Sequence, residues 1–135
     1  MKQRMLDTHV ILRYILRDHD QLSPQARDLF VNAAKGEIEL LLDPVVIAEC
    51  CAVLSGKIYG YAKRDVAGVL GQIVMMEGVF AADPVILSEA LEFYAKHNLD
   101  FTDAYLAMTA RGKGVTVVDF DHDFSRASPD ASVNV

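Results

Sequence analysis

The stretch GKGVTVVDFDHD, residues 112–123, combines a turn, a strand and a group of acids. Gly112–Gly114 predicts the end of a helix, because glycine readily adopts the left-handed backbone that closes a helix. Val115–Val118 is the clearest strand in the chain, since β-branched residues favour extended backbone. Asp119–Asp123 follows directly. In parallel α/β sheets, sites lie beyond the carboxyl ends of the strands, so this strand would deliver carboxylates to such a site.

The same alternation of strands and helices runs through the rest of the chain, which predicts an α/β fold. Ser23 at the N-cap and Pro24 at the first helical position predict one helix start. Further strands are expected at 4–6, 37–42 and 79–82, with an edge strand at 133–135, and helices at 9–16, 23–36, 45–55, 64–76, 84–97 and 100–111. We therefore expect a three-layer fold: a central, mainly parallel sheet of four or five strands flanked by helices. With no linker or repeat, residues 1–135 form a single expected domain.

Composition excludes several classes of protein. No apolar run approaches the ~20 residues that cross a bilayer, and no signal segment is recognisable, so a cytoplasmic protein is expected. Cys50 and Cys51 are adjacent and lack spaced Cys or His partners, which predicts reduced core residues rather than a zinc site. A net charge of −6 argues against binding of nucleic acid by bulk electrostatics. If the protein acts on RNA, cations must bridge the two.

Five carboxylates are expected to converge at the carboxyl edge of the sheet: Asp7, Glu49, Asp103, Asp119 and Asp121. Glu49 stands in a helix that is otherwise apolar on every face, and such a helix is expected to be buried, so its carboxylate needs a partner. The other acids have structural alternatives. Asp7 could be only a helix N-cap, Asp103 only a first-turn acid after a cap at Asp100, and the residues after 118 only a solvated loop.

Converging carboxylates repel one another, so either their pKa values rise or a cation binds between them. Hard oxygen ligands without Cys or paired His select Mg²⁺ or Mn²⁺ over zinc. Such an ion polarises phosphoryl oxygens and lowers the pKa of bound water, and phosphodiester hydrolysis is the natural reaction of such a site.

Four stretches resemble the motifs of the PIN domain family, in the family's order and over nearly the whole chain: LDTHV (6–10), DPVVIAE (43–49), LDFTDA (99–104) and VVDFDHDF (117–124). Each motif is weak alone, but four in order are specific. The residues that match the family's catalytic and metal-binding acids are Asp7, Glu49, Asp103 and Asp121. Asp119, a further metal-ligand candidate, stands where the family usually has Ser or Thr. Thr8 and His9 would support the ligands, with His9 in place of the usual Asn.

The resemblance implies a Mg²⁺- or Mn²⁺-dependent endoribonuclease. The small single-domain form is similar to VapC-type toxins of type II toxin–antitoxin systems, which implies a homodimer, a cognate antitoxin protein and an RNA substrate. One alternative is a PIN-like module that binds protein or RNA without cutting it. A phosphoacceptor receiver domain is a weaker alternative, because Asp7 is followed by Thr and His rather than by an acid, and no Lys follows the late strand.

Overall fold

The computed structural model describes residues 2–120 and 132–134, and it is built on a parallel sheet of three strands. The strands are β1 (Lys2–Met5), β2 (Ile38–Leu41) and β3 (Val79–Phe80), with β2 in the middle. Helices make the crossovers that parallel pairing requires: α1 (Thr8–Leu16) and α2 (Leu22–Ala34) before β2, and α3 (Pro44–Ser55) and α4 (Lys63–Val74) before β3. α5 (Pro84–Lys96) and α6 (Phe101–Lys113) follow β3.

Three helices begin with the same local device. The side chains of Asp43, Asp83 and Asp100 accept hydrogen bonds from backbone N–H groups in the first turns of α3, α5 and α6, at 2.9, 3.1 and 3.1 Å. Proline occupies the first position of α3 and of α5, where its missing N–H costs nothing. These starts were readable from the sequence, because capping depends only on neighbouring residues.

The start of α2 was predicted wrongly. Ser23 is not the N-cap: the helix begins at Leu22 after Gln21. His19 replaces it, because its Nδ1 accepts from the backbone N–H groups of Gln21 and Leu22 at 3.2 and 2.9 Å. The Ser23 hydroxyl instead donates to the backbone oxygen of Arg13 at 2.8 Å, which ties α2 to α1.

One core joins the sheet to the helices, and it includes Ile11, Leu40, Ile47, Leu70 and Leu87, each at most 1% exposed. Gly78 allows α2 to approach the start of β3. Its φ of +88° favours glycine, and a Cβ there would clash with the carbonyl of Ala33.

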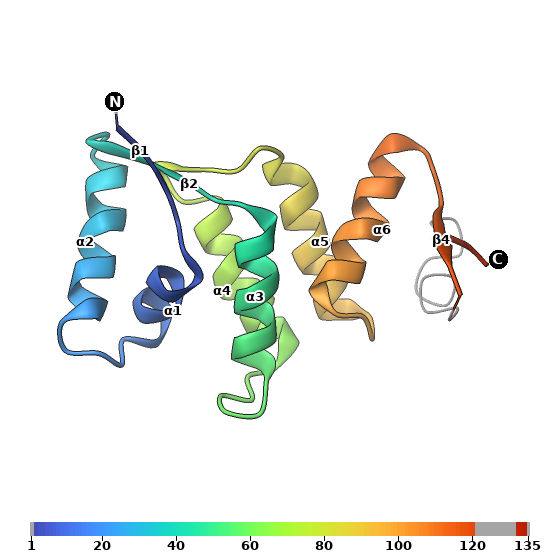
Figure 1. The fold of residues 1–135 in the computed structure, drawn as a ribbon, viewed down its shortest axis with the longest axis horizontal. Helices are drawn as coiled ribbons and strands as arrows, with labels where there is room; N and C mark the ends of the chain where they lie inside the picture. The colour runs from blue at the N-terminus through green and yellow to red at the C-terminus, as the bar shows by residue number, and fades with distance from the viewer. Residues whose placement is uncertain (1, 121–131, 135) are drawn as a thin grey trace.

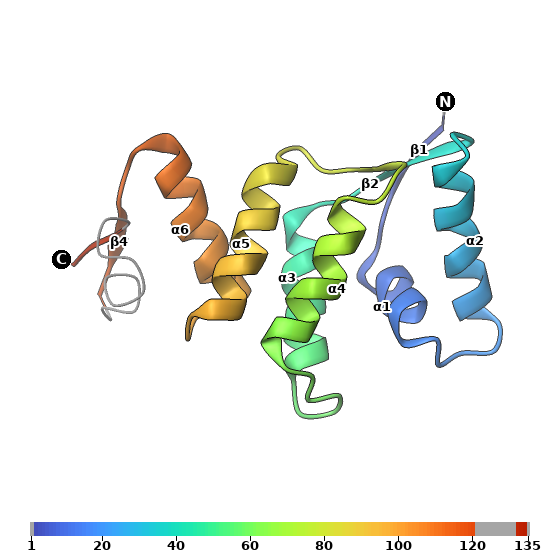
Figure 2. The same ribbon diagram turned by 180° about the vertical axis from the view of Figure 1, so that it is seen from behind.

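The remaining strands form a separate two-stranded sheet, which we call the β4–β5 unit: β4 (Val117–Asp119) paired in parallel with β5 (Ser132–Asn134). The expected α/β class, with parallel strands flanked by helices, is confirmed, but the single sheet of four or five strands is not. Among the described residues β4 contacts β5 and α6 rather than β1. α5 and α6 lie between the three-stranded sheet and the β4–β5 unit (Figures 1 and 2).

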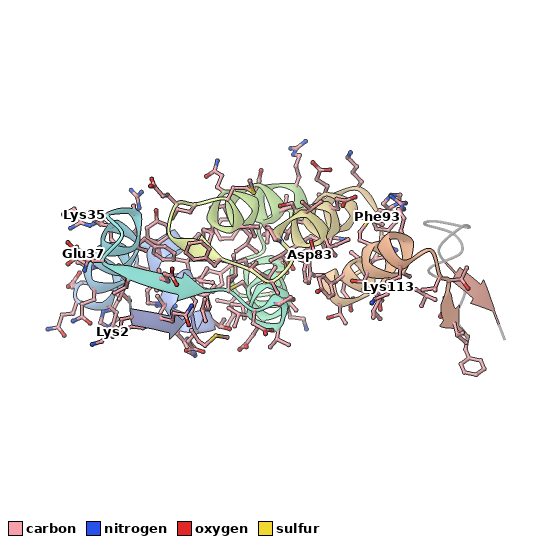
Figure 3. The ribbon with its side chains drawn as sticks, turned by 90° about the horizontal axis from the view of Figure 1, so that it is seen from above. Lys2, Lys35, Glu37, Asp83, Phe93 and Lys113 are labelled. Carbon is pink, nitrogen blue, oxygen red and sulfur yellow. The ribbon has the colours of Figure 1, made fainter. Side chains whose placement is uncertain are left out.

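The elements follow one another along the longest axis of the molecule: α2, α1, then α3 with α4, then α5, α6 and the β4–β5 unit (Figures 1 and 2). Figure 3 shows the same order from above, with Lys2 at the start of β1 and Lys113 at the end of α6 in opposite halves. Within the described part of the chain, no helix has the length and apolar character needed to cross a membrane.

Candidate functional site

Two of the expected acids, Asp7 and Glu49, lie near each other where β1 leads into α1; we call them the acid pair. Thr8, the first residue of α1, is 2% exposed, and its Oγ1 donates to Oε2 of Glu49 at 3.0 Å. This hydrogen bond joins residues 41 positions apart. It therefore fixes the Glu49 carboxylate on α3 against the start of α1, one residue from Asp7.

Asp7 occupies the N-cap position of α1 without acting as a side-chain cap. Its backbone oxygen accepts from the N–H of Val10 at 3.1 Å, but its carboxylate makes no capping hydrogen bond. The purely structural alternative for Asp7 is therefore not what the geometry shows. The Asp7 side chain is exposed to solvent at the N-terminus of α1.

The expectation that Glu49 is buried within an apolar helix was wrong. The buried residues of α3 are Ile47, Cys50, Cys51 and Leu54, whereas Glu49 is exposed and Val45 is 70% exposed. An all-apolar sequence does not reveal which face of a helix lacks a covering element. Glu49 is thus a solvent-accessible carboxylate with one oxygen fixed by Thr8.

The charge of the acid pair affects the pKa of Cys50, the buried residue that follows Glu49 on α3. Burial, followed by the negative charges of Glu49 and Asp7, raises the pKa of the Cys50 thiol to about 12. Cys51 has its pKa raised to about 12, mainly by burial. Both thiols are free and buried, which confirms the expected reduced core residues. Within the described residues, no Lys or Arg forms an ion pair with Asp7 or Glu49.

Asp103 lies in the first turn of α6, where Asp100 accepts a hydrogen bond from its backbone N–H. Lys63, at the start of α4, binds the segment that leads into this turn. Its Nζ donates to the backbone oxygens of His97 and Leu99 at 2.7 and 2.6 Å. The same Nζ lies 4.4 Å from the centre of the Tyr94 ring. Burial lowers the pKa of Lys63, while the charges of Asp100 and Cys51 oppose that change. No sequence signal marked this role.

The remaining predicted acids belong to the C-terminal region. Asp119 is the last residue of β4 and only 8% exposed. Asp121 lies outside the described residues. Across residues 2–120 and 132–134, no three His, Cys, Asp or Glu side chains gather as a metal site would require. Convergence of all five acids therefore stays a prediction, and the described structure brings together only the acid pair.

The donor chemistry of the acid pair suits a hard divalent cation. Two carboxylates, one oriented by a hydroxyl and neither neutralised by a described Lys or Arg, provide oxygen ligands that Mg²⁺ and Mn²⁺ prefer. A bound Mg²⁺ ordinarily keeps several waters and takes only one or two protein carboxylates. The acid pair could thus provide the protein ligands of a Mg²⁺ or Mn²⁺ ion whose other ligands are waters.

His9 follows Thr8 in the first turn of α1. With Arg13, Leu22 and Leu29 it lines a groove of about 170 Å³ between α1 and α2. The described contacts include no hydrogen bond from His9 to Asp7 or Glu49. Its proposed support of a metal ligand stays a prediction.

Two cationic residues of the described chain, Arg13 and Lys63, already have partners. Arg13 forms an ion pair with Asp18 at 2.9 Å, and Lys63 binds the backbone oxygens described above.

Comparison with known families adds one match: the PIN domain, over residues 4–128. No curated protein and no solved structure matches the chain.

Proposed function

Because the chain belongs to the PIN domain family, whose members are nucleases that typically depend on divalent metal ions, we propose that it is a Mg²⁺- or Mn²⁺-dependent endoribonuclease. The observation that carries the proposal is the acid pair, with Glu49 held by Thr8 at 3.0 Å beside Asp7. Phosphodiester hydrolysis needs a metal-binding group that polarises the phosphate and activates water. The two accessible carboxylates, Asp7 after β1 and Glu49 on α3, can supply the first ligands of such a metal ion.

In this proposal the acid pair supplies metal ligands, and Asp103, Asp119 and Asp121 complete the set. A bound metal would lower the pKa of a water and offset charge on the phosphate. The residues of the chain do the positioning: Thr8 orients Glu49, and Lys63 orders the turn before Asp103. RNA would be held mainly through the metal, as the net charge of −6 requires.

We further propose that the protein is a VapC-type toxin, active as a homodimer and blocked by a cognate antitoxin. The resemblance of the four motifs supports this, together with an apolar groove of about 250 Å³ lined by Ile15, Leu16, Leu54, Val66 and Val69. An amphipathic segment of a partner would bury apolar side chains in such a groove.

The test is an RNA cleavage assay with the purified full chain. Cleavage is expected with Mg²⁺ or Mn²⁺, loss of cleavage with a chelator, and recovery when metal is restored. Glu49→Gln should lower the rate strongly, whereas Glu37→Gln, an exposed control at the end of the α2–β2 connection, should not.

A melting experiment separates catalysis from simple binding. Because metal relieves repulsion between ionised carboxylates, it binds the folded state preferentially and raises the melting temperature. RNA binding without cleavage, and a melting temperature unchanged by Mn²⁺, would favour the non-catalytic interaction module instead.

A further inference from the structure

The connection between α3 and α4, residues 56–62, presents aromatic and apolar side chains to solvent. Ile58 is 89% exposed and Tyr61 is 48% exposed, while Tyr59 is half-buried. The connection projects beyond the neighbouring helices, at the lower edge of the molecule in Figure 1. Large side chains of this kind gathered at one place on a surface are a common sign of an interaction site.

Two of these side chains, Tyr59 and Tyr61, hold their rings parallel; we call them the tyrosine pair. The ring centres lie 6.3 Å apart, and the ring planes differ by only 5°. Backbone hydrogen bonds fix the turn that carries them. The N–H of Gly60 donates to the carbonyl of Gly56 at 2.7 Å, and the N–H of Tyr61 donates to the carbonyl of Leu54 at 2.9 Å. The fold itself therefore orients the backbone of the tyrosine pair.

The same region is positively charged in a chain whose net charge is −6. From Cys50 to Arg64 the sequence contains Lys57, Lys63 and Arg64 and no Asp or Glu. Lys63 binds backbone oxygens, whereas Lys57 and Arg64 are exposed and form no ion pair with any described residue. Exposed cations within a few residues of parallel aromatic rings suit a ligand that has both flat apolar faces and negative charges.

Single-stranded RNA has both properties. Its bases stack on aromatic side chains in a way that tolerates any sequence, and its phosphates attract Lys and Arg. We propose that the tyrosine pair is a stacking platform for an unpaired RNA base, with Lys57 and Arg64 contacting the adjacent phosphates. A protein segment would also cover Ile58, but parallel rings combined with nearby cations match a nucleic acid more closely.

The platform would extend the proposed site along α3, which carries Glu49 and leads into the connection that holds the tyrosine pair. From Glu49 to Ser55 the helix rises ~9 Å, at ~1.5 Å per residue. A stacked strand advances ~3.4 Å per nucleotide, so a base on the platform would lie at least about three nucleotides from a phosphate at the acid pair. That the stacked strand is the substrate rests on the proposed function; the stacking itself does not.

The first test uses Tyr59→Trp, because the natural sequence contains no tryptophan. Tyr59 is preferred to Tyr61, because Tyr61 also lines the apolar groove proposed for a partner segment. The titrant is a short oligouridylate, with a chelator present so that no RNA is cleaved. Stacking of uracil on the indole should quench its fluorescence. An abasic oligonucleotide of the same length keeps the phosphates but has no bases, and it should not quench.

The control is Met75→Trp, which places the tryptophan at the opposite end of α4, at a position that is 72% exposed. Neither oligonucleotide should quench it. Equal quenching of Tyr59→Trp by both titrants would mean contact with phosphate alone. No quenching by either would leave the exposed rings to a protein partner. Each of these results, or equal quenching of Met75→Trp by the oligouridylate, overturns the proposal.

Affinity provides a second measurement. Tyr59→Leu removes the ring, so the Kd for the oligouridylate should rise roughly 5- to 150-fold, the range for one base stacked on an aromatic side chain. The Kd for the abasic oligonucleotide should stay the same. Tyr59→Phe keeps the ring and should bind as the parent does. Parental affinity in a folded Tyr59→Leu protein overturns the proposal; if that variant does not fold, the quenching of Tyr59→Trp decides.

The phosphate contact is tested by salt. Lys57→Ala should weaken binding of both oligonucleotides alike and lower the slope of log affinity against log salt by ~0.7. Lys35→Ala, an exposed control at the end of α2, should change neither. An unchanged slope in Lys57→Ala overturns this contact. All these measurements work without metal or cleavage, so a parent that cleaves no RNA with Mn²⁺ would refute the proposed function and leave the platform to be decided by quenching.

Discussion

The acid pair and the β4–β5 unit carry similar acids but are held in place by different means. Asp7 and Glu49 are set by β1, α1 and α3, whose buried residues belong to one core, and by the hydrogen bond from Thr8. Asp119 stands on a small sheet joined to the body by a three-residue connection. The difference teaches that a shared core and one hydrogen bond fix the acid pair, whereas the position of Asp119 depends on the pairing of one short strand.

The largest effect on RNA cleavage should come from Asp7→Asn, in the acid pair. This change removes a ligand charge with little change in volume, so we expect cleavage to fall at least ~100-fold, as for other groups that stabilise charge in the transition state. The melting temperature without metal should change little. Asp20→Asn, at an exposed position in the α1–α2 connection, is the control. Near-normal cleavage by Asp7→Asn would remove the acid pair from the mechanism.

The next effect separates Asp121 from Asp119. On the family alignment Asp121 is one of the catalytic acids and Asp119 is not, so Asp121→Ala should cost more activity than Asp119→Ala. Asp119→Ala should lose roughly tenfold, as a residue that orients the site. Initial rates at saturating Mn²⁺ measure both. Equal losses, or the reverse order, would show that the alignment slips by two residues after β4.

A smaller effect is expected from Thr8→Val, which keeps the shape of the side chain but removes the donor to Glu49. Loss of such an orienting hydrogen bond typically lowers metal affinity or activity ~10- to 100-fold, and the lower end is expected here because Glu49 is exposed. Thr8→Ser retains the hydroxyl and should stay close to the parent. Titration with Mn²⁺ measures the affinity directly; a Thr8→Val curve that overlays that of Thr8→Ser would show that the bond does not serve the site.

Substitution of Cys50 and Cys51 should have the smallest effect on cleavage, near zero. The two thiols should instead affect the free energy of unfolding at high pH. Their folded pKa of about 12 lies above the ordinary value of 9.0. Between these values the folded state binds more protons than the unfolded state, so the free energy of unfolding falls as pH rises from 9 toward 12. Each thiol contributes at most ~1.4 kcal/mol per pH unit.

Chemical denaturation at pH 8, 9 and 10 measures this slope, and Cys50→Ala/Cys51→Ala should reduce it. Part of the slope should remain, because burial also raises the pKa of Tyr94, which acts in the same direction. An unchanged slope in the double variant would contradict the assignment. Lys63, whose pKa is lowered, acts in the opposite direction and should be kept in both proteins.

The sequence by itself determined the local features of this protein. The caps at Asp43, Asp83 and Asp100, and the order of strands and helices, follow from residues within a few positions of each other. The placement of Asp7 at the end of a strand was readable for the same reason. The four motifs that resemble the PIN family were also readable, and they led to the family that the comparison then matched over residues 4–128.

Only the tertiary structure decided the rest. The hydrogen bond from Thr8 to Glu49 spans 41 positions, and the exposure of Glu49 depends on which face of α3 no other element covers. At the start of α2, His19 rather than Ser23 caps the backbone. The loop before the helix brings the Nδ1 of His19 to the N–H groups of Gln21 and Leu22. The division of the strands between two sheets was also not readable from the sequence, since hydrogen bonding alone would let β4 pair at any open parallel edge.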